Sequence, residues 1–159
     1  PEEKLEIYGD LMRIITAQSM EYFSSRPKEN KQMILFCLDE FASFGKLQIT
    51  PALRRLRKRR IRILVLTQSV SDVDMIYGKD ERIAMLGNFK FTVILGCKDT
   101  ETQEYFSKMI GEKRSLLATD PNQKRQPIIK PADLAHLEQD LFVISDDGAI
   151  RLRKNFYFK

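Results

Sequence analysis

Residues 34–40 read Ile34-Leu35-Phe36-Cys37-Leu38-Asp39-Glu40, an uninterrupted apolar run that ends in two adjacent acids. Such a run, bounded by polar residues on both sides, is typical of a strand buried on both faces of a parallel sheet. In α/β sheets, ligands bind at the carboxyl ends of the strands. The stretch therefore predicts a buried strand over Met33–Leu38 that carries Asp39 and Glu40 to a ligand-binding edge.

A second apolar run, Ile61–Thr67, ends in Gln68. Between the two runs, Thr50 followed by Pro51 is a helix start signal, because Thr caps free amide groups and Pro fits the first helical turn. A strand, a helix and a strand in this order predict two parallel neighbours whose carboxyl ends share one edge. We therefore expect Gln68 to lie in the same crevice as the two acids.

The remaining sequence continues the alternation of helices and strands. Hydrophobic spacing and cap residues predict helices over Leu5–Phe23, Thr50–Arg60, Ser71–Tyr77, Asp80–Leu86, Thr100–Gly111 and Pro131–Glu138, and further strands over Phe89–Cys97, Leu141–Ser145 and Ala149–Phe158. The first helix is expected to bury one apolar stripe that includes Tyr8, Ile15 and Tyr22, and residues 113–127 are expected to form a polar loop. The pattern predicts an α/β fold with a mostly parallel sheet, closed by a C-terminal antiparallel hairpin at Asp147-Gly148.

The composition narrows the class of protein. The 159 residues, 43% hydrophobic and 31% charged, suit one globular domain. No apolar run approaches the roughly 20 residues of a membrane-spanning helix, and the first residues lack the pattern of a signal peptide, so we expect a cytosolic setting. Cys37 and Cys97 have no zinc or redox spacing and are expected to be buried free thiols, and His136 is expected to be structural.

The acids at the end of the first strand allow two interpretations. In ATP-hydrolysing P-loop enzymes this arrangement is the Walker B element, in which the first acid holds the Mg²⁺ shell and the second polarises the attacking water. Mg²⁺ favours carboxylate oxygen and retains water, so one or two acids suffice. The alternative is that Asp39 and Glu40 are solvated strand caps. Gln68 favours the first interpretation, because an amide can hydrogen-bond both a γ-phosphate oxygen and the lytic water.

A basic cluster lies between the two strands. Its seven members are Arg54, Arg55, Arg57, Lys58, Arg59, Arg60 and Arg62. Without them the net charge would change from +5 to −2, so the basicity is local and not a property of the whole chain. The cluster can be a solvated helix face with Leu53 and Leu56 packed inward, a surface for nucleic-acid phosphates, or the source of an arginine finger that reaches the ATP of a neighbouring subunit.

Several short motifs follow one another along nearly the whole chain. They are Leu38-Asp39-Glu40-Phe41-Ala42-Ser43-Phe44-Gly45-Lys46-Leu47, Ile61-Arg62-Ile63-Leu64-Val65-Leu66-Thr67-Gln68-Ser69, Ile76-Tyr77-Gly78, Asn88, Asp99-Thr100-Glu101-Thr102, Tyr105-Phe106-Ser107 and Gly111. With these motifs in this order, the sequence resembles the TraG/TraD-type coupling proteins of type IV secretion and conjugation, which are related to the FtsK and HerA DNA translocases.

The resemblance implies a RecA-like P-loop NTPase that assembles as a homo-oligomeric ring and uses ATP and Mg²⁺. It implies DNA and a DNA-bound relaxase as cargo, and docking on the secretion channel at the bacterial inner membrane, where segments outside this sequence would anchor the protein. Asp39 and Glu40 fall on the family's metal positions, Asp39 acting through water, and Asp39 and Gln68 fall on its nucleotide positions. Arg59, Arg60 and Arg62 are the candidates for the arginine finger.

One departure from the family limits these expectations. The sequence contains no Gly-x-x-x-x-Gly-Lys followed by Ser or Thr, the loop whose backbone amides hold the phosphates. Residues 1–159 are therefore expected to be the C-terminal portion of a RecA-like nucleotide-binding domain that lacks the Walker A strand and loop. Alone, the chain is expected neither to bind ATP tightly nor to hydrolyse it. The alternative function is a non-catalytic RecA-like module that binds DNA or a secretion partner through the basic helix.

Overall fold

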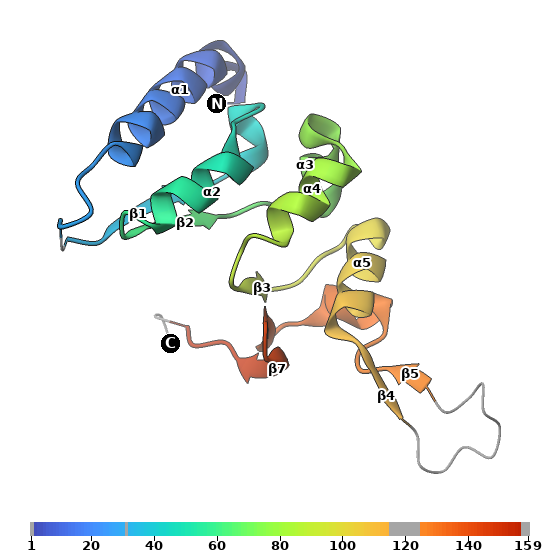
Figure 1. The fold of residues 1–159 in the computed structure, drawn as a ribbon. Coiled ribbons are helices and arrows are strands. Elements are labelled where there is room, and N and C mark those ends of the chain that lie inside the picture. Colours follow the sequence, from blue (N-terminus) through green and yellow to red (C-terminus); the bar gives the residue numbers. More distant parts are fainter. Residues whose placement is uncertain (1, 31, 115–124, 157–159) are drawn as a thin grey trace. The chain divides into compact units, whose positions relative to one another are not determined.

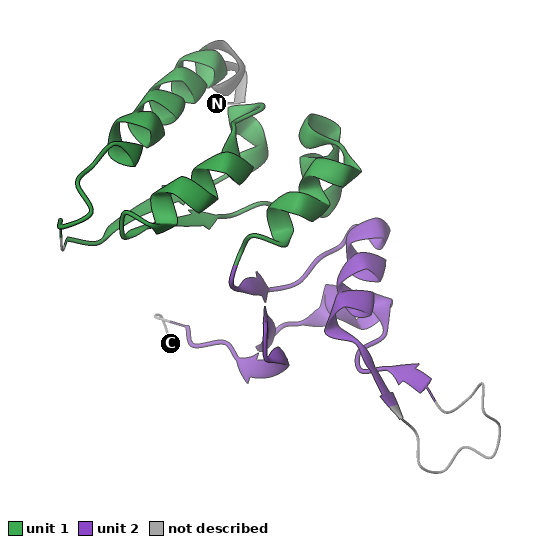
Figure 2. Ribbon diagram, in the orientation of Figure 1, with its two compact units in different colours: residues 1–89 green, residues 90–159 purple. Residues whose placement is uncertain are grey.

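The computed structural model describes residues 2–30, 32–114 and 125–156. The chain forms two compact units, residues 1–89 and residues 90–159 (Figure 2). In the described part of the chain, no helix has both the length and the apolar character needed to cross a membrane.

The first unit is built on a parallel strand pair covered by helices (Figure 1). Its elements are α1 (Glu2–Ser24), β1 (Ile34–Leu38), the 3-10 helix η1 (Phe41–Phe44), α2 (Ile49–Arg57), β2 (Ile61–Val65), α3 (Val70–Tyr77) and α4 (Lys79–Leu86). The pairing runs in register from Ile34 opposite Ile61 to Leu38 opposite Val65. The predicted parallel neighbours and the helix that joins them are confirmed.

The core of this unit follows from the spacing of apolar residues on α2. Ile49, Ala52 and Leu56 recur at intervals of three and four residues and are all buried, while the basic residues Arg54, Arg55 and Arg57 occupy exposed positions. One face of the strand pair, including Leu38, completes the core. The hydrophobic stripe of α2 thus fixes which side of the helix meets the sheet.

Three expectations about burial in this unit are wrong. Burial alternates along β1, and Leu35 is 60% exposed, so the strand is buried on one face only. Cys37, on the same strand, is exposed and not buried. On α1, Tyr8, Ile15 and Tyr22 are 50% exposed or more, and among the α1 residues whose burial is described, Met20 is the buried one. An apolar run shows that a segment can be buried on both faces, but it does not show which neighbours are present to cover it.

The two short helices α3 and α4 are joined at Gly78. Ser69 caps α3 by accepting a hydrogen bond from the amide of Asp72 at 3.0 Å. Gly78 has φ of 78°, and a Cβ built there would meet nothing within 4 Å, so the backbone angle and not the space favours glycine. Arg82 of α4 makes a two-pronged ion pair with Asp74 of α3, at 2.7 and 3.2 Å. This pair ties the two helices together.

The second unit combines helices with antiparallel strands. Its elements are β3 (Thr92–Ile94), α5 (Thr100–Ile110), β4 (Glu112–Arg114), β5 (Arg125–Pro127), the 3-10 helix η3 (Pro131–His136), β6 (Asp140–Ser145) and β7 (Gly148–Arg153). The strands β3, β6 and β7 form one sheet in that order, with Phe142 and Ile144 packed into the core. The predicted C-terminal hairpin is confirmed, because Ser145 pairs with Gly148 across a two-residue turn.

The predicted α/β class is confirmed, but the mostly parallel sheet needs correction. Among the described residues, β1 and β2 form the one parallel pair, whereas β3 pairs antiparallel with β6. The third predicted strand therefore does not continue the parallel ladder. The predicted loop over residues 113–127 also begins and ends in paired strands, β4 and β5, and its residues 115–124 lie outside the described part of the chain. Pairing partners distant in sequence leave no local signal, so these details escaped prediction.

Candidate functional site

The carboxyl ends of β1 and β2 lie at the same edge because the strands are parallel and in register. The ladder continues beyond the strands: the amide of Leu66 donates to the carbonyl of Leu38, and the amide of Phe41 donates to the carbonyl of Leu66, both at 2.9 Å. These two bonds draw the segments that follow the strands together. Asp39, Glu40 and Gln68 are all exposed on these segments.

Glu40 and Gln68 are in direct contact. The Nε2 of Gln68 donates to both carboxylate oxygens of Glu40, at 3.1 and 3.2 Å, across 28 residues of sequence. The expected approach of Gln68 to the strand-end acids is therefore present for Glu40. An acid that can accept a proton lies beside an amide whose oxygen can still accept a hydrogen bond, which is an arrangement suited to orienting a water molecule.

The backbone of Glu40 is in the left-handed region, with φ and ψ both 50°. This conformation costs a residue with a side chain about 1–2 kcal/mol, and strain of this kind gathers at functional sites. Three hydrogen bonds surround it: the Oδ1 of Asp39 accepts from the amide of Glu40 at 3.1 Å, the carbonyl of Glu40 accepts from Ser43, and the next amide bonds to Leu66. The neighbourhood holds Glu40 in a conformation it would not adopt alone.

Asp39 offers one carboxylate oxygen beyond the one bonded to Glu40. Among the described residues no group of three or more His, Cys, Asp or Glu side chains could hold a metal ion. A site of one or two carboxylates fits Mg²⁺, which keeps several waters and takes other ligands from nucleotide phosphates. It does not fit a metal that is enclosed by protein ligands on all sides. The donor set thus agrees with the sequence-based expectation for Asp39 and Glu40.

The candidate finger arginines lie at the other end of the strand pair. The carbonyl of Arg60 accepts from the amide of Ile34, where both strands begin. From Arg62 to Gln68 the chain advances six residues, which is about 20 Å of extended strand. The structure therefore does not bring Arg59, Arg60 or Arg62 to the Glu40 and Gln68 contact within one chain.

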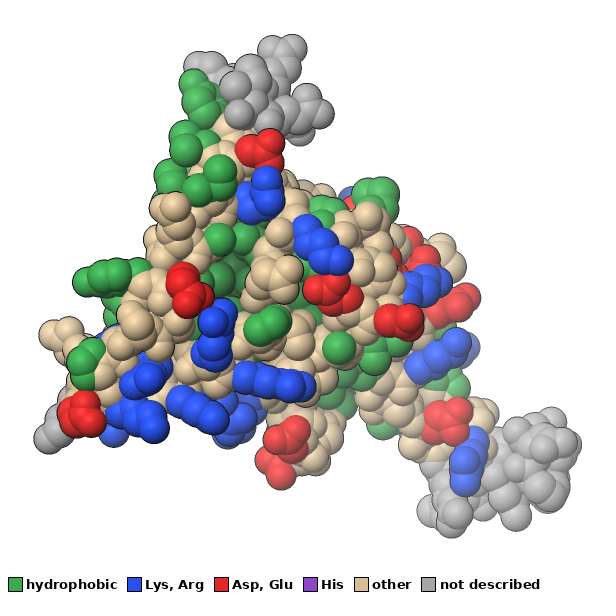
Figure 3. Space-filling view, turned by 45° about the horizontal axis from the view of Figure 1, so that its top comes forward, with side chains coloured by type: hydrophobic (Ala, Val, Ile, Leu, Met, Phe, Trp, Pro, Cys, Tyr) green, Lys and Arg blue, Asp and Glu red, His purple; other side chains and the backbone are tan. Residues whose placement is uncertain are grey.

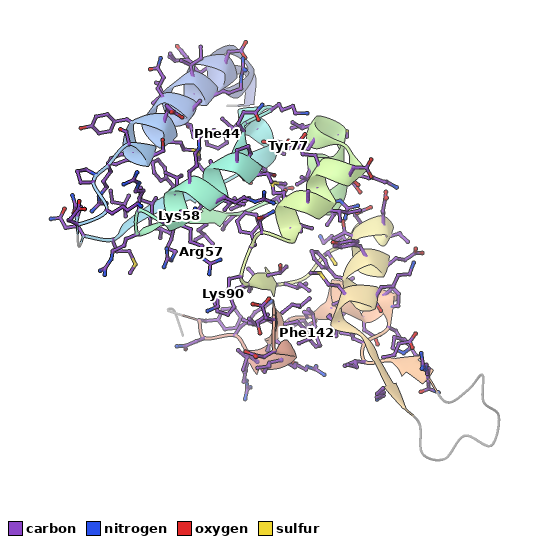
Figure 4. All side chains as sticks on the ribbon, in the orientation of Figure 1. Phe44, Arg57, Lys58, Tyr77, Lys90 and Phe142 are labelled. Carbon is purple, nitrogen blue, oxygen red and sulfur yellow. The ribbon has the colours of Figure 1, made fainter. Side chains whose placement is uncertain are left out.

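The basic cluster contains both paired and unpaired members. Arg54 donates to Asn88 at 3.2 Å, Arg55 pairs with Glu21 at 3.2 Å, and the Nη1 of Arg62 reaches a backbone carbonyl at 3.4 Å. The side chains that have no partner among the described residues are those of Arg57, Lys58, Arg59 and Arg60. Lys and Arg side chains crowd together at the lower left of Figure 3, and Figure 4 marks Arg57 and Lys58 at the end of α2. This end of the unit has uncompensated positive charge.

Two of the quoted motifs have structural explanations. Asp99 caps α5 by accepting from the amide of Thr102 at 2.9 Å and from its hydroxyl, so the Asp-x-Glu-Thr motif is a helix cap. Tyr77, for which no role was expected, bonds through its hydroxyl to the segment that follows the two acids. The sequence feature that could have pointed to Tyr77 is the Tyr-Gly pair at the end of a predicted helix.

Comparison with known families gives a specific match. The model of the family described as "TraM recognition site of TraD and TraG" matches residues 33–139. Protein VirD4 of Rhizobium rhizogenes is 28% identical in an alignment of 172 positions that covers 97% of this chain and 26% of that protein. Conjugal transfer protein TraG of Agrobacterium fabrum is 25% identical in an alignment of 165 positions that covers 94% of this chain and 25% of that protein. The chain thus spans about a quarter of the length of these relatives.

Solved structures of the plasmid coupling protein TrwB are similar to the chain. The complex of TrwB with a non-hydrolysable GTP analogue has a TM-score of 0.76 at 26% identity, covering 95% of this chain and 39% of that one. The complex of TrwB with ADP and Mg²⁺ has a TM-score of 0.74 at the same identity and coverage. The likeness extends over both units of the chain.

Proposed function

This chain belongs to the TraD and TraG family of type IV secretion coupling proteins, and we propose that it supplies hydrolysis residues to an ATP-driven motor. The observation that carries this proposal is the contact between Glu40 and Gln68 at the carboxyl ends of two parallel strands. The motor moves DNA and its bound relaxase towards the secretion channel. TrwB, solved with ADP and Mg²⁺, supports ATP and Mg²⁺ as the nucleotide and metal of the whole protein.

Three side chains divide the chemistry. Bound Mg²⁺-ATP supplies the phosphoryl group to be transferred. The carboxylate of Asp39 would hold the metal through a water molecule, and the carboxylate of Glu40 polarises the attacking water by accepting its hydrogen bond. Gln68 keeps the Glu40 carboxylate in place through its amide nitrogen and orients the water or a γ-phosphate oxygen.

The basic end of the strand pair acts on a second subunit. Because the structure does not bring Arg59, Arg60 or Arg62 to the contact of Glu40 with Gln68, we assign them to the nucleotide site of another chain and not of their own. In a homo-oligomeric ring, one of these guanidiniums reaches the ATP of a neighbouring subunit and neutralises the charge that develops during phosphoryl transfer. The ring is part of the proposal.

Other parts of the whole protein complete the motor. The phosphate-binding loop, which this sequence does not contain, would come from outside residues 1–159. The chain would then be a cytoplasmic portion of a protein anchored in the bacterial inner membrane by other segments. By itself it would bind ATP weakly.

The pairing of Glu40 with Gln68 provides a test of the proposal. In the whole coupling protein, Gln68→Leu is expected to lower kcat for ATP hydrolysis by roughly a hundredfold and to change KM little, because the amide orients groups that react. Added to Glu40→Gln, the same change should cause little further loss, since residues that act as a unit are not additive. Steady-state kinetics of the two single variants and the double variant measure this.

A matched control for Gln68→Leu is Gln18→Leu on α1, which changes an exposed Gln in the same way. It should leave kcat unchanged. Normal turnover in Gln68→Leu, or full additivity with Glu40→Gln, would count against the assigned roles.

The unpaired basic residues favour a second candidate function, DNA binding through the end of α2. Arg57→Gln and Lys58→Gln together are expected to weaken DNA binding and to reduce the slope of log affinity against log salt by about two, because each lost phosphate contact lowers it by about 0.9. Fluorescence titrations with duplex DNA at several salt concentrations measure the slope. The control is Lys108→Gln, at an exposed position of α5, which should leave the salt slope unchanged. Salt-independent affinity would contradict this function.

A further inference from the structure

Tyr77, the last residue of α3, is buried and uses both hydrogen-bonding capacities of its hydroxyl group. The hydroxyl accepts from the amide of Leu47 at 2.9 Å and donates to the carbonyl of Gly45 at 3.2 Å. These partners lie 30 and 32 residues earlier in the sequence. One side chain therefore closes the turn at residues 45–47, directly downstream of η1.

The ring of Tyr77 also supports the start of η1. It stacks on the ring of Phe41 with centroids 5.4 Å apart and planes 11° apart, and Phe41 is completely buried. The backbone of Phe41 is fixed separately, because its amide donates to Leu66 at 2.9 Å. Phe41 directly follows Glu40, so the position of its ring and its amide limits the backbone of Glu40.

A second attachment holds the same segment. Lys46 pairs with Glu81 of α4 at 2.7 Å, one residue from each hydrogen-bond partner of Tyr77. Gly45 has φ of 66°, a left-handed angle that lets the chain turn sharply towards Tyr77. The segment after β1 is thus bound to α3 through Tyr77 and to α4 through Glu81.

The hydroxyl of Tyr77 remains a donor at neutral and mildly alkaline pH. Burial is the main factor that raises its pKa above the ordinary value of 10.0, and the negative charge of Glu81 adds to the increase, while the hydrogen bond from Leu47 acts in the opposite direction. The bond to the Gly45 carbonyl, which requires the proton, therefore persists over the pH range in which ATPases are assayed.

We propose that Tyr77 is a positioning residue that holds the strained backbone of Glu40, through Phe41 and the turn at residues 45–47, so that the Glu40 carboxylate faces Gln68. This rests on the proposed function of Glu40. It explains why a Tyr-Gly pair stands at the end of a short helix: Tyr77 is the last residue of α3, and Gly78, with φ of 78°, ends the helix directly after it.

The test uses Tyr77→Phe in the whole coupling protein, which keeps the ring on Phe41 and removes only the hydroxyl. We expect kcat for ATP hydrolysis to fall about ten- to hundredfold with KM nearly unchanged, because a displacement of about 1 Å in a reacting group can cost a hundredfold. Without nucleotide, hydrogen exchange followed by mass spectrometry should be faster in peptides that cover residues 40–48. Tyr22→Phe on α1, where the side chain is 74% exposed, is the matched control and should change neither.

Lys46→Met provides a second variant whose fold is not at risk, since it removes the exposed attachment and leaves no buried polar group unpaired. It should lower kcat several-fold and accelerate exchange over the same residues. This variant decides the matter if Tyr77→Phe does not fold.

The outcomes separate the two proposals. Unchanged exchange over residues 40–48, or unchanged kcat with a raised KM, overturns the positioning role. If Glu40→Gln is inactive and Tyr77→Phe is fully active, the positioning role alone fails. If Glu40→Gln retains turnover, the proposed function fails, and the exchange measurement still reports whether Tyr77 holds the segment of Glu40.

Discussion

Replacing Glu40 with Gln in the whole coupling protein is expected to lower kcat for ATP hydrolysis by roughly 10²–10⁴-fold, the contribution typical of a general base. The substitution preserves the size of the side chain, and the new amide can still hydrogen-bond to Gln68. The left-handed backbone is therefore expected to persist. What disappears is the charge that accepts the proton of the attacking water, so KM for ATP should remain within about threefold.

The measurement is steady-state hydrolysis together with nucleotide binding followed by fluorescence. Glu104→Gln applies the same chemical change to an exposed acid on α5 and should behave like the unaltered protein. If the turnover of the Glu40→Gln variant is within about tenfold of that of the unaltered protein, Glu40 is not the general base. The strand-end acid would then be a solvated cap.

The second large effect concerns stability. Asp74→Ala removes an ion-pair partner of Arg82, whose side chain is only 6% exposed, and so weakens the compensation of a guanidinium charge buried at α3 and α4. Breaking a buried ion pair on one side typically costs about 3–5 kcal/mol. We expect the free energy of unfolding, measured by urea denaturation of the chain, to fall by about that amount.

Two comparisons test this explanation. The double variant Asp74→Leu with Arg82→Met replaces both charges by apolar groups and should recover most of the loss, because buried pairs are often replaceable by packed hydrophobic residues. Asp10→Ala breaks the exposed pair with Arg13 and should cost about 0.5 kcal/mol or less. Equal losses from Asp74→Ala and Asp10→Ala would mean that burial of the first pair does not matter.

Much of the site could be predicted because its residues are marked by their position after apolar runs. The strand ending at Leu38 and the strand ending at Val65 were both recognisable, and parallel strands bring their carboxyl ends together. The sequence alone therefore predicts that Gln68 approaches Glu40. The hairpin between β6 and β7 was equally local, because its turn residues lie within the sequence that they join.

The features that escaped prediction depend on contacts between distant segments. The hydroxyl of Tyr77 meets residues 30 and 32 positions away, and no periodicity records such a contact. The antiparallel partner of β3 is β6, which lies about 50 residues later in the sequence. The exposed stripe of α1 had the spacing of a buried one, because spacing identifies an apolar face and says nothing about its cover.

If the proposed ring forms, the separation of Gln68 and the candidate finger arginines at opposite ends of β2 would affect the timing of hydrolysis. One five-residue strand would carry Gln68 beyond one end and Arg60 before the other, so its two ends would serve two different nucleotides. A small tilt of the strand after hydrolysis of one ATP would then move the guanidinium charge of a candidate finger arginine at the nucleotide of the neighbouring subunit. Neighbouring subunits would then hydrolyse ATP in order without a separate relay, because β2 would itself connect their reaction centres.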